Sequence, residues 1–248
     1  MRDWFDDDAF WAAAYPFMFP ENRFEAGRTQ VEQIVQLTGC TSGGVLDLAC
    51  GPGRHSVPLA EQGFAVTAVD RNAWLLERAR AHAAAAGVTV EWVQSDMRQF
   101  VRPESYDLAL NLFTSFGYFD DPRENELVLD NVRTSLRPGG CFVLDVIGKE
   151  ILARNFQPTH SDEIPGAGIV VQRRRILDDW SRIEVDWLHL HQDRVRAFQF
   201  RHWLYSGQEL KTMLAAAGFA DVRTYGGVDG ASYGPEARRL IAVGRKAN

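Results

Sequence analysis

The sequence has no run of about 20 consecutive apolar residues, the length that a helix needs to cross a bilayer. Its first segment, Met1–Asp8, is acidic, whereas a secretory signal begins with a basic segment that is followed by an apolar one. Its three cysteines, Cys40, Cys50 and Cys141, lie far apart and form no CxxC pair, which disfavours a disulfide framework or a cysteine-based zinc site. These features predict a cytoplasmic protein with no membrane partner.

Positive charge is in the minority, because 27 Lys and Arg residues face 33 Asp and Glu residues for a net charge of −6. A protein that binds DNA or RNA along its length needs the opposite balance, so we expect no bulk nucleic-acid binding. The chain also lacks internal repeats, low-complexity stretches and a linker rich in Pro, Gly or Ser. With 248 residues, 46% of them hydrophobic, it fits one large globular α/β domain.

Between residues 44 and 148, apolar segments alternate with helical ones. The expected strands are Val45–Ala49, Ala65–Val69, Val88–Val93, Tyr106–Leu112 and Cys141–Ile147. Asn72 is a helix-capping residue and Gly87 a left-handed stop, while Asp121 and Pro122 are typical of the start of a further helix that ends at Gly139. Strands separated by helices pair in parallel through right-handed crossovers, so the pattern predicts a doubly wound sheet.

The pattern changes after residue 150. Apolar residues alternate with acidic ones through Ile183–Trp187, and a short turn at 191–194 predicts an antiparallel hairpin. A capping box at Ser206 starts a helix, and the strands Asp221–Tyr225 and Leu240–Val243 return to the main sheet. We therefore expect a helical arm over 1–40, a core over 41–149 plus 206–248, and an inserted β-hairpin flap over 150–205.

A glycine turn joins the first expected strand to a helix, in Val45-Leu46-Asp47-Leu48-Ala49-Cys50-Gly51-Pro52-Gly53. Glycine lets backbone approach a ligand, and a helix start offers free N–H groups. Asp70 ends the next strand, where a carboxylate can accept both hydroxyls of a ribose. Ser56 stands where a dinucleotide site has its third glycine, and no Walker loop is present. Asp96 and Met97 follow the third strand and suit an adenine.

These segments resemble the class I S-adenosylmethionine-dependent methyltransferases. The motifs that carry the resemblance are Leu46–Gly53, Val69-Asp70, Ser95-Asp96-Met97-Arg98 and Asn111-Leu112-Phe113-Thr114-Ser115-Phe116-Gly117-Tyr118. The resemblance implies a Rossmann-like seven-stranded sheet whose last strand is antiparallel, with S-adenosyl-L-methionine as cofactor. It also implies that Asp47 and the backbone of Ala49, Gly51 and Gly53 hold the methionine part. In the same way, Asp70 would hold the ribose, Arg71, Asp96 and Met97 the adenine, and the Leu112 carbonyl the methionine amino group.

Within this family the chain is similar to enzymes that methylate sugar amines and amino-acid-like amines. We therefore expect transfer of a methyl group to nitrogen or oxygen of a small molecule, mainly by proximity and alignment. A general base is needed only when the acceptor must lose a proton, and Tyr118 and Asp145 are the candidates. Tyr15, Tyr118 and Tyr233 are the expected substrate contacts.

Several alternatives stay open on the sequence. The acceptor could be a protein or an RNA, the chain could be a cofactor-binding module without catalysis, or it could be a nicotinamide-dependent oxidoreductase. His189, His191 and His202 suggest a metal site only weakly, since no matched carboxylate accompanies them, so we expect no metal. An exposed hairpin edge could pair two copies of the chain into a homodimer.

Overall fold

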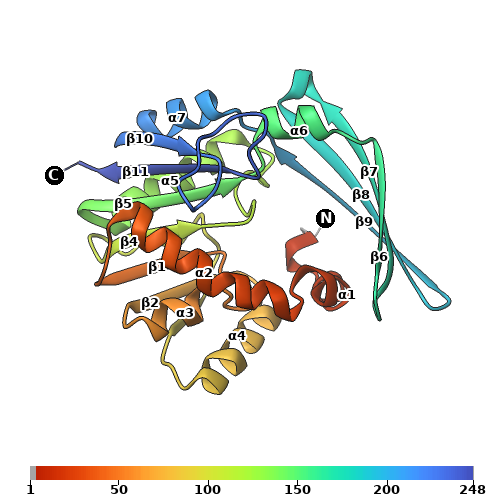
Figure 1. Cartoon of the computed structure of the whole chain (residues 1–248), viewed down its shortest axis with the longest axis horizontal. Helices are drawn as coiled ribbons and strands as arrows, with labels where there is room; N and C mark the ends of the chain where they lie inside the picture. The colour runs from red at the N-terminus through yellow and green to blue at the C-terminus, as the bar shows by residue number, and fades with distance from the viewer. Residues whose placement is uncertain (1–3, 248) are drawn as a thin grey trace.

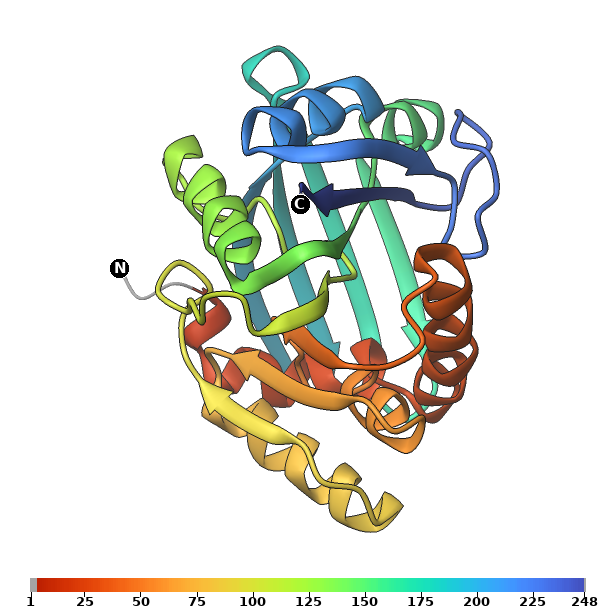
Figure 2. The same ribbon diagram turned by 90° about the vertical axis from the view of Figure 1, so that its left-hand side faces the viewer.

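The computed structural model describes residues 4–247, so that residues 1–3 of the expected arm and residue 248 lie outside the described part. Seven strands form the main sheet in the order β10-β11-β5-β4-β1-β2-β3 (Figure 1). Their bounds are Gly44–Leu48 (β1), Ala65–Asp70 (β2), Glu91–Gln94 (β3), Tyr106–Asn111 (β4), Leu136–Val146 (β5), Phe219–Tyr225 (β10) and Leu240–Lys246 (β11). Figure 2 shows these strands in that order from top to bottom, with a second sheet running behind them.

Pairing within the main sheet confirms the doubly wound topology. β1 pairs in parallel with β2 and β4, β2 with β3, and β4 with β5. β11 is antiparallel to both β5 and β10, as expected for the last strand. Because the four parallel pairings place the carboxyl ends of their strands at one edge, the segments that follow β1, β2, β3 and β4 meet there.

Helices cover both faces of the main sheet. Their bounds are Glu21–Thr38 (α2), Ser56–Glu61 (α3), Ala73–Ala86 (α4), Pro122–Ser135 (α5) and Gly207–Ala216 (α7). One buried cluster joins α5 and α7 to the sheet, and a second joins α2, α3 and α4 to it. Asn72 caps α4 and Gly87 ends it in the left-handed conformation, both as expected. Burial on both faces explains why the parallel strands are almost uniformly apolar.

The helix α5 ends four residues earlier than expected. It stops at Ser135, and Leu136 already begins β5 by pairing with Tyr106. Gly139 has a φ of 74°, and the register of β4 and β5 shifts between Tyr106 and Leu108. The glycine pair therefore lies in an irregular start of the strand and does not terminate the helix.

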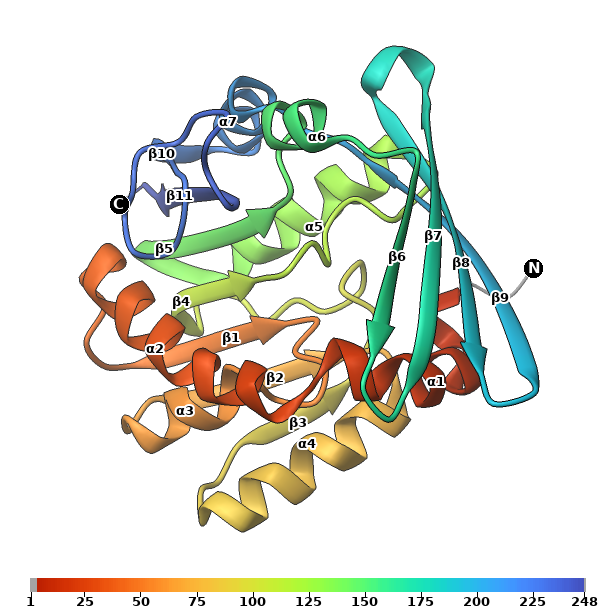
Figure 3. The same ribbon diagram turned by 45° about the vertical axis from the view of Figure 1, so that its right-hand side comes forward.

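The segment expected to be a hairpin is a four-stranded antiparallel sheet, ordered β6-β7-β8-β9. Its strands are Thr159–Ile164 (β6), Gly168–Leu177 (β7), Arg182–His191 (β8) and Arg194–Trp203 (β9), with a short helix, Lys149–Asn155 (α6), before them and a 3-10 turn, Asp178–Trp180 (η2), after β7. The sequence of β6 is mostly polar and shows no alternation of apolar and polar residues. Its residues are extended because they pair with β7 through backbone hydrogen bonds. In Figure 3 the arrowheads of β1, β4 and β5 point toward this second sheet.

The described part of the N-terminal arm lies between the two sheets (Figure 1). This part consists of a 3-10 turn, Trp4–Asp6 (η1), and the helix Asp8–Met18 (α1), whereas α2, which also falls within the expected 1–40, packs on the main sheet. Phe10 of α1 stacks on Trp187 of β8 with ring centroids 5.9 Å apart. On the other side, the Asn72 amide donates to Asp8 of α1 at 3.0 Å. The arm therefore ties the second sheet to the carboxyl edge of the main sheet. None of the helices within residues 4–247 is long and apolar enough to span a bilayer.

Candidate active site

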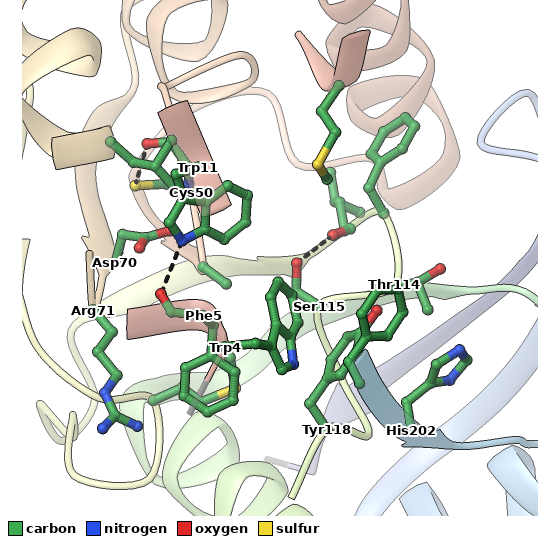
Figure 4. Close-up of a pocket in the computed structure, with 18 of the residues that line it drawn as sticks. Trp4, Phe5, Trp11, Cys50, Asp70, Arg71, Thr114, Ser115, Tyr118 and His202 are labelled. Atoms are coloured by element: carbon green, nitrogen blue, oxygen red, sulfur yellow. Dashed lines mark hydrogen bonds between the residues drawn. The ribbon is translucent and has the colours of Figure 1, made fainter. Parts of the chain in front are cut away.

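A cavity of about 430 Å³ lies between the carboxyl edge of the main sheet, the arm and the second sheet. Its lining divides into a polar part and an aromatic part. The polar part comes from the segments that follow β1, β2, β3 and β4. The aromatic part comes from η1, α1, Tyr118, β8 and β9. Figure 4 shows both parts, with Asp70 and Arg71 on one side and Tyr118 and His202 on the other.

Most of the residues expected to form a site come together here, although they are scattered along the sequence. Those that line the cavity are Asp47, Ala49, Gly51, Asp70, Arg71, Asp96, Met97, Leu112 and Tyr118. They converge because parallel strands deliver their carboxyl ends to one edge of the sheet. Gly53, Tyr15, Asp145 and Tyr233 are not part of the lining.

The turn after β1 offers backbone and open space to the cavity. Ala49 has a φ of 60° and Gly51 a φ of 55°, both in the left-handed region. The Gly51 N–H donates to Asp70 Oδ2 at 2.8 Å, so the turn is fixed to the end of β2. A Cβ on Gly51 would lie 3.7 Å from the Phe19 ring, which also lines the cavity. A side chain there would therefore take up ligand space without hitting the core.

Gly53, whose backbone was expected to hold the methionine part of the cofactor, lies outside the cavity lining. A Cβ at this position would lie 2.9 Å from Trp92 and 3.2 Å from Ala79 of α4. Its φ of 82° is also a conformation that disfavours other residues. Gly53 is therefore needed for close packing of the turn against α4, and it does not face the cavity.

Asp47 is a buried carboxyl group at the end of β1, only 2% exposed. The Ser56 hydroxyl donates to its Oδ2 at 2.5 Å. Burial raises the pKa of Asp47 to about 6, and the hydrogen bond from Ser56 opposes this only in part. A cationic ligand group at this carboxylate would relieve the cost of its burial.

The acids that end β2 and follow β3 are held in place by donors. Asp70 accepts the N–H groups of Gly51 and Asn72, both at 2.8 Å, and each of its oxygens keeps a further lone pair for a ligand. Asp96 accepts from the Arg98 guanidinium at 2.6 Å and from Arg71 at 3.1 Å. Burial raises the pKa of Asp96, but the hydrogen bonds from Arg98 outweigh it and hold this pKa below its usual range.

A cationic corner, which the sequence reasoning missed, lies beside this turn. The Arg54 side chain is 7% exposed and its guanidinium carbon lies 3.3 Å from the centroid of the Phe113 ring. Burial, and then the neighbouring Arg23, lowers the pKa of Arg54 to about 10. Over residues 4–247 no carboxylate lies within ion-pair distance of Arg54, so this corner fits an anionic ligand group.

Asp145 supports the loop after β4 and does not reach the cavity, which corrects its expected catalytic role. Its Oδ2 accepts the Phe113 N–H at 3.0 Å, and its Oδ1 accepts from Arg239 at 2.6 Å. Arg239 also donates to the Thr114 hydroxyl at 2.7 Å. Phe113 and Thr114 have φ values of 59° and 63°, a strained pair of left-handed residues. Asp145 is therefore a positioning residue, because it lies outside the cavity lining and its two oxygens anchor Phe113 and Arg239.

Two tyrosines expected to contact a substrate lie elsewhere. Tyr15 packs against Phe19 and Trp74, with ring centroids 5.3 and 5.5 Å away. Tyr233 donates its hydroxyl to Glu150 at 2.6 Å and so fastens the C-terminal loop to α6. Both rings are used in packing between elements, because aromatic side chains supply large buried contact areas.

Tyr118 is in the cavity, but its chemistry does not suit a base. Burial raises the pKa of its hydroxyl well above the usual range. His202 lies next to it, with ring centroids 5.2 Å apart (Figure 4). Burial lowers the pKa of His202 to about 4, so its imidazole is neutral at pH 7. Its Nδ1 lies 3.1 Å from the Trp203 carbonyl, so Nδ1 carries the proton and Nε2 remains an acceptor.

The histidines of β8 do not form a metal centre. His189 bonds to the Ala167 carbonyl through Nε2 at 2.6 Å, and its ring stacks on His191 with centroids 6.0 Å apart. In the part of the chain that the structure describes, no three His, Cys, Asp or Glu side chains are grouped to hold a metal ion.

Comparisons with known proteins identify relatives of this arrangement. The family model described as a methyltransferase domain matches residues 45–140. The glycine/sarcosine N-methyltransferase of Aphanothece halophytica is 27% identical over 185 residues, which cover 73% of this chain and 68% of the relative. The ubiquinone biosynthesis O-methyltransferase of Histophilus somni is 28% identical over 120 residues, which cover 48% of this chain and 50% of the relative. The structure of the CcbJ methyltransferase from Streptomyces caelestis covers both chains completely with a TM-score of 0.82 and 20% identity.

Proposed function

We propose that this chain, which belongs to the class I S-adenosylmethionine-dependent methyltransferases that act on small molecules, transfers the methyl group to the nitrogen of a small amine. The observation that carries the proposal is that a single cavity contains both the polar part, where the cofactor motifs at the strand ends meet, and the aromatic part. The candidate bases of the aromatic part are Tyr118, which is protonated, and His202, whose lowered pKa makes it a weak base.

The polar part of the cavity fits the cofactor. Asp47 would hold the methionine ammonium group, and the Arg54 guanidinium would offer its unused donors to the methionine carboxylate. Asp70 receives the ribose hydroxyls with its remaining lone pairs. Because Gly51 has no side chain, space remains beside it for the methionine part of S-adenosylmethionine. When bound, S-adenosylmethionine supplies a methyl group that its sulfonium has already activated.

The adenine end lies at β3 and the amino end at β4. Asp96 and Met97 line the cavity after β3, and Arg71 lies 3.1 Å from Asp96. The Leu112 carbonyl accepts from the Ser115 hydroxyl at 2.9 Å and keeps a second lone pair for an ammonium group. These residues bind and orient the two ends of the cofactor.

The aromatic part encloses the acceptor and excludes water. Trp4 contacts both Tyr118 and Phe200, with ring centroids 5.1 and 5.2 Å away. Water is thereby kept from the reacting atoms, and orientation of two reactants in such a site is worth up to about 7–11 kcal/mol of the barrier.

Nitrogen is favoured over oxygen because a neutral amine attacks with its own lone pair, whereas an alcohol must first lose a proton. Tyr118 holds its proton tightly, His202 is a weak base, and Asp145 is occupied by Arg239. The apolar surroundings also favour an amine in its neutral form. The name of the cyanobacterial relative, a glycine/sarcosine N-methyltransferase, supports the same choice.

Formation of S-adenosylhomocysteine in the presence of mixed acceptors tests this proposal. The purified chain receives S-adenosylmethionine with a pool of small amines, or with a pool of phenols and alcohols of matched size. We expect turnover with amines only, and loss of it in Asp70→Ala. Faster turnover with the oxygen pool would contradict the choice of nitrogen, and no turnover with either pool would contradict catalysis on small molecules.

A further inference from the structure

One wall of the cavity carries an arginine that faces inward from the second sheet. Gln172 and Arg174 of β7 line the cavity, whereas Arg173 between them is exposed on the opposite face. This alternation follows from the pleat of a strand, which sends successive side chains to opposite faces. Of the three consecutive arginines in this strand, the register selects Arg174 alone for the cavity.

Arg174 is half-buried without a counter-charge at contact distance. Its guanidinium donates to the Gln172 side-chain oxygen at 2.7 Å. Among residues 4–247 no carboxylate lies within ion-pair distance of it. Burial lowers the pKa of Arg174, and the more distant Asp162 opposes this to a smaller degree. The neighbouring Arg175 differs, because it forms an ion pair with Glu184 on the outer face.

A desolvated guanidinium that faces a cavity favours an anionic ligand. Because the Gln172 side-chain oxygen accepts from Arg174, the two amide N–H groups of Gln172 remain available as further donors. The planar guanidinium of Arg174 and the adjacent Gln172 amide together suit one carboxylate, because a carboxylate can accept two parallel hydrogen bonds from an arginine. Apart from His202, the other side chains of the second sheet that line the cavity are largely apolar, among them Val185, Trp187 and Phe200.

We propose that the acceptor amine carries a carboxylate, and that Arg174 with Gln172 binds it. This inference rests on the proposed function and adds the chemical class of the substrate. Arg174 is paired across the sheet with Val185, which is paired with Phe200, and His202 lies two residues beyond Phe200. With strands about 4.8 Å apart and a rise of about 3.4 Å per residue, the Cα atoms of Arg174 and His202 are about 12 Å apart. An acceptor that reaches from Arg174 to Tyr118 and His202 carries its carboxylate and its amine at opposite ends, with the side chains of Val185 and Phe200 between them.

Matched pairs of amines test the proposal. Each pair consists of an amino carboxylate and its carboxamide, in a series that includes straight ω-amino acids of increasing length and 4-(aminomethyl)benzoate. Formation of S-adenosylhomocysteine gives kcat/KM for each member. We expect the carboxylate of the best pair to exceed its amide by about 10- to 100-fold, the range for hydrogen bonds to a charged group. Arg174→Gln removes this preference, Arg174→Lys keeps part of it, and the matched control Arg173→Gln leaves it unchanged.

The outcomes separate this inference from the proposed function. Unfolding temperature and affinity for S-adenosylmethionine should be the same in Arg174→Gln and the original chain, which shows that the substitution acts on the acceptor. The inference is overturned if carboxamides are methylated as fast as carboxylates, or if Arg173→Gln and Arg174→Gln have equal effects. Either result leaves the proposed methyl transfer to amines intact. If no amine is methylated, titration of the carboxylates into the chain loaded with S-adenosylhomocysteine decides. Binding that requires Arg174 then supports the anion site, and no binding overturns it.

Discussion

Replacement of Asp47 by asparagine should stabilise the fold at neutral pH and weaken cofactor binding. The carboxyl group is 2% exposed and accepts one side-chain hydrogen bond, from Ser56. Asparagine can accept the same bond through its oxygen, but it carries no charge that must be buried. The substitution therefore removes the cost of ionisation and keeps the local contact.

The size of the effect follows from the pKa. Burial raises the pKa of Asp47 from 3.8 to about 6, a shift of about two units. At about 1.4 kcal/mol per unit, ionised Asp47 destabilises the folded state by about 3 kcal/mol. Because the folded-state pKa is the higher one, the folded state binds more protons between pH 3.8 and 6, and stability falls as the pH rises through this window.

Urea unfolding of both chains at pH 4, 5, 6, 7 and 8 measures the effect. The advantage of Asp47→Asn should be small at pH 4 and should grow to about 3 kcal/mol by pH 8. Asp193→Asn, at the exposed turn between β8 and β9, is the control and should show no such trend. An advantage of Asp47→Asn that is independent of pH would refute the reasoning. Calorimetric titration should also show affinity for S-adenosylmethionine reduced by about tenfold or more, because the methionine ammonium loses its counter-charge.

Three further substitutions have expected outcomes. Ala49→Gly should raise stability by about 1 kcal/mol in urea unfolding, because Ala49 has a φ of 60° and glycine adopts it without strain; an unchanged or lower stability would contradict this. Asp145→Asn should raise KM for S-adenosylmethionine more than it lowers kcat, because an amide has one acceptor oxygen and keeps only one of the two hydrogen bonds that anchor Phe113 and Arg239; a selective loss of kcat would restore a catalytic role. Tyr118→Phe should lower kcat by less than about tenfold, since its high pKa prevents it from acting as a base, and general-base catalysis is worth about 100-fold or more. A loss of that larger size in steady-state rates would contradict this interpretation.

The sequence is sufficient to predict the main sheet and the acidic residues in the polar part of the cavity, but not Arg54 beside them. Asp47, Asp70 and Asp96 each follow a short apolar run, and the carboxyl ends of parallel strands meet at one edge. The position of such residues depends only on local pattern and on sheet topology. Both can be read along the chain.

The remaining features depend on contacts between distant segments. Asp145 could not be recognised as a positioning residue, because its partner Arg239 lies 94 residues further along the chain. The strand β6 was missed because its residues are mostly polar and pairing with β7 alone makes it extended. The inward direction of Arg174 is fixed by sheet register, since a shift of one residue would exchange it with Arg173.

The positions of Tyr15 and Tyr233 also depend on contacts between distant segments. The sequence places Tyr15 in the arm and Tyr233 in the C-terminal loop, both expected near the acceptor, yet Tyr15 packs beside Trp74 and Tyr233 donates to Glu150. Residue type alone does not reveal which face of an arm or loop turns to a cavity. His202 was considered only as a metal ligand, although burial beside Tyr118 makes it a neutral acceptor.

Calorimetric titration of the full chain with S-adenosylmethionine decides whether the ends of β1, β2 and β3 bind this cofactor. We expect one site per chain with an affinity in the micromolar range, and a loss of about tenfold or more, about 1.4 kcal/mol, in Asp70→Ala. Arg173→Gln should leave this affinity unchanged. An affinity weaker than millimolar in the original chain, together with no effect of Asp70→Ala, would contradict the claim that the ends of β1, β2 and β3 form the cofactor site.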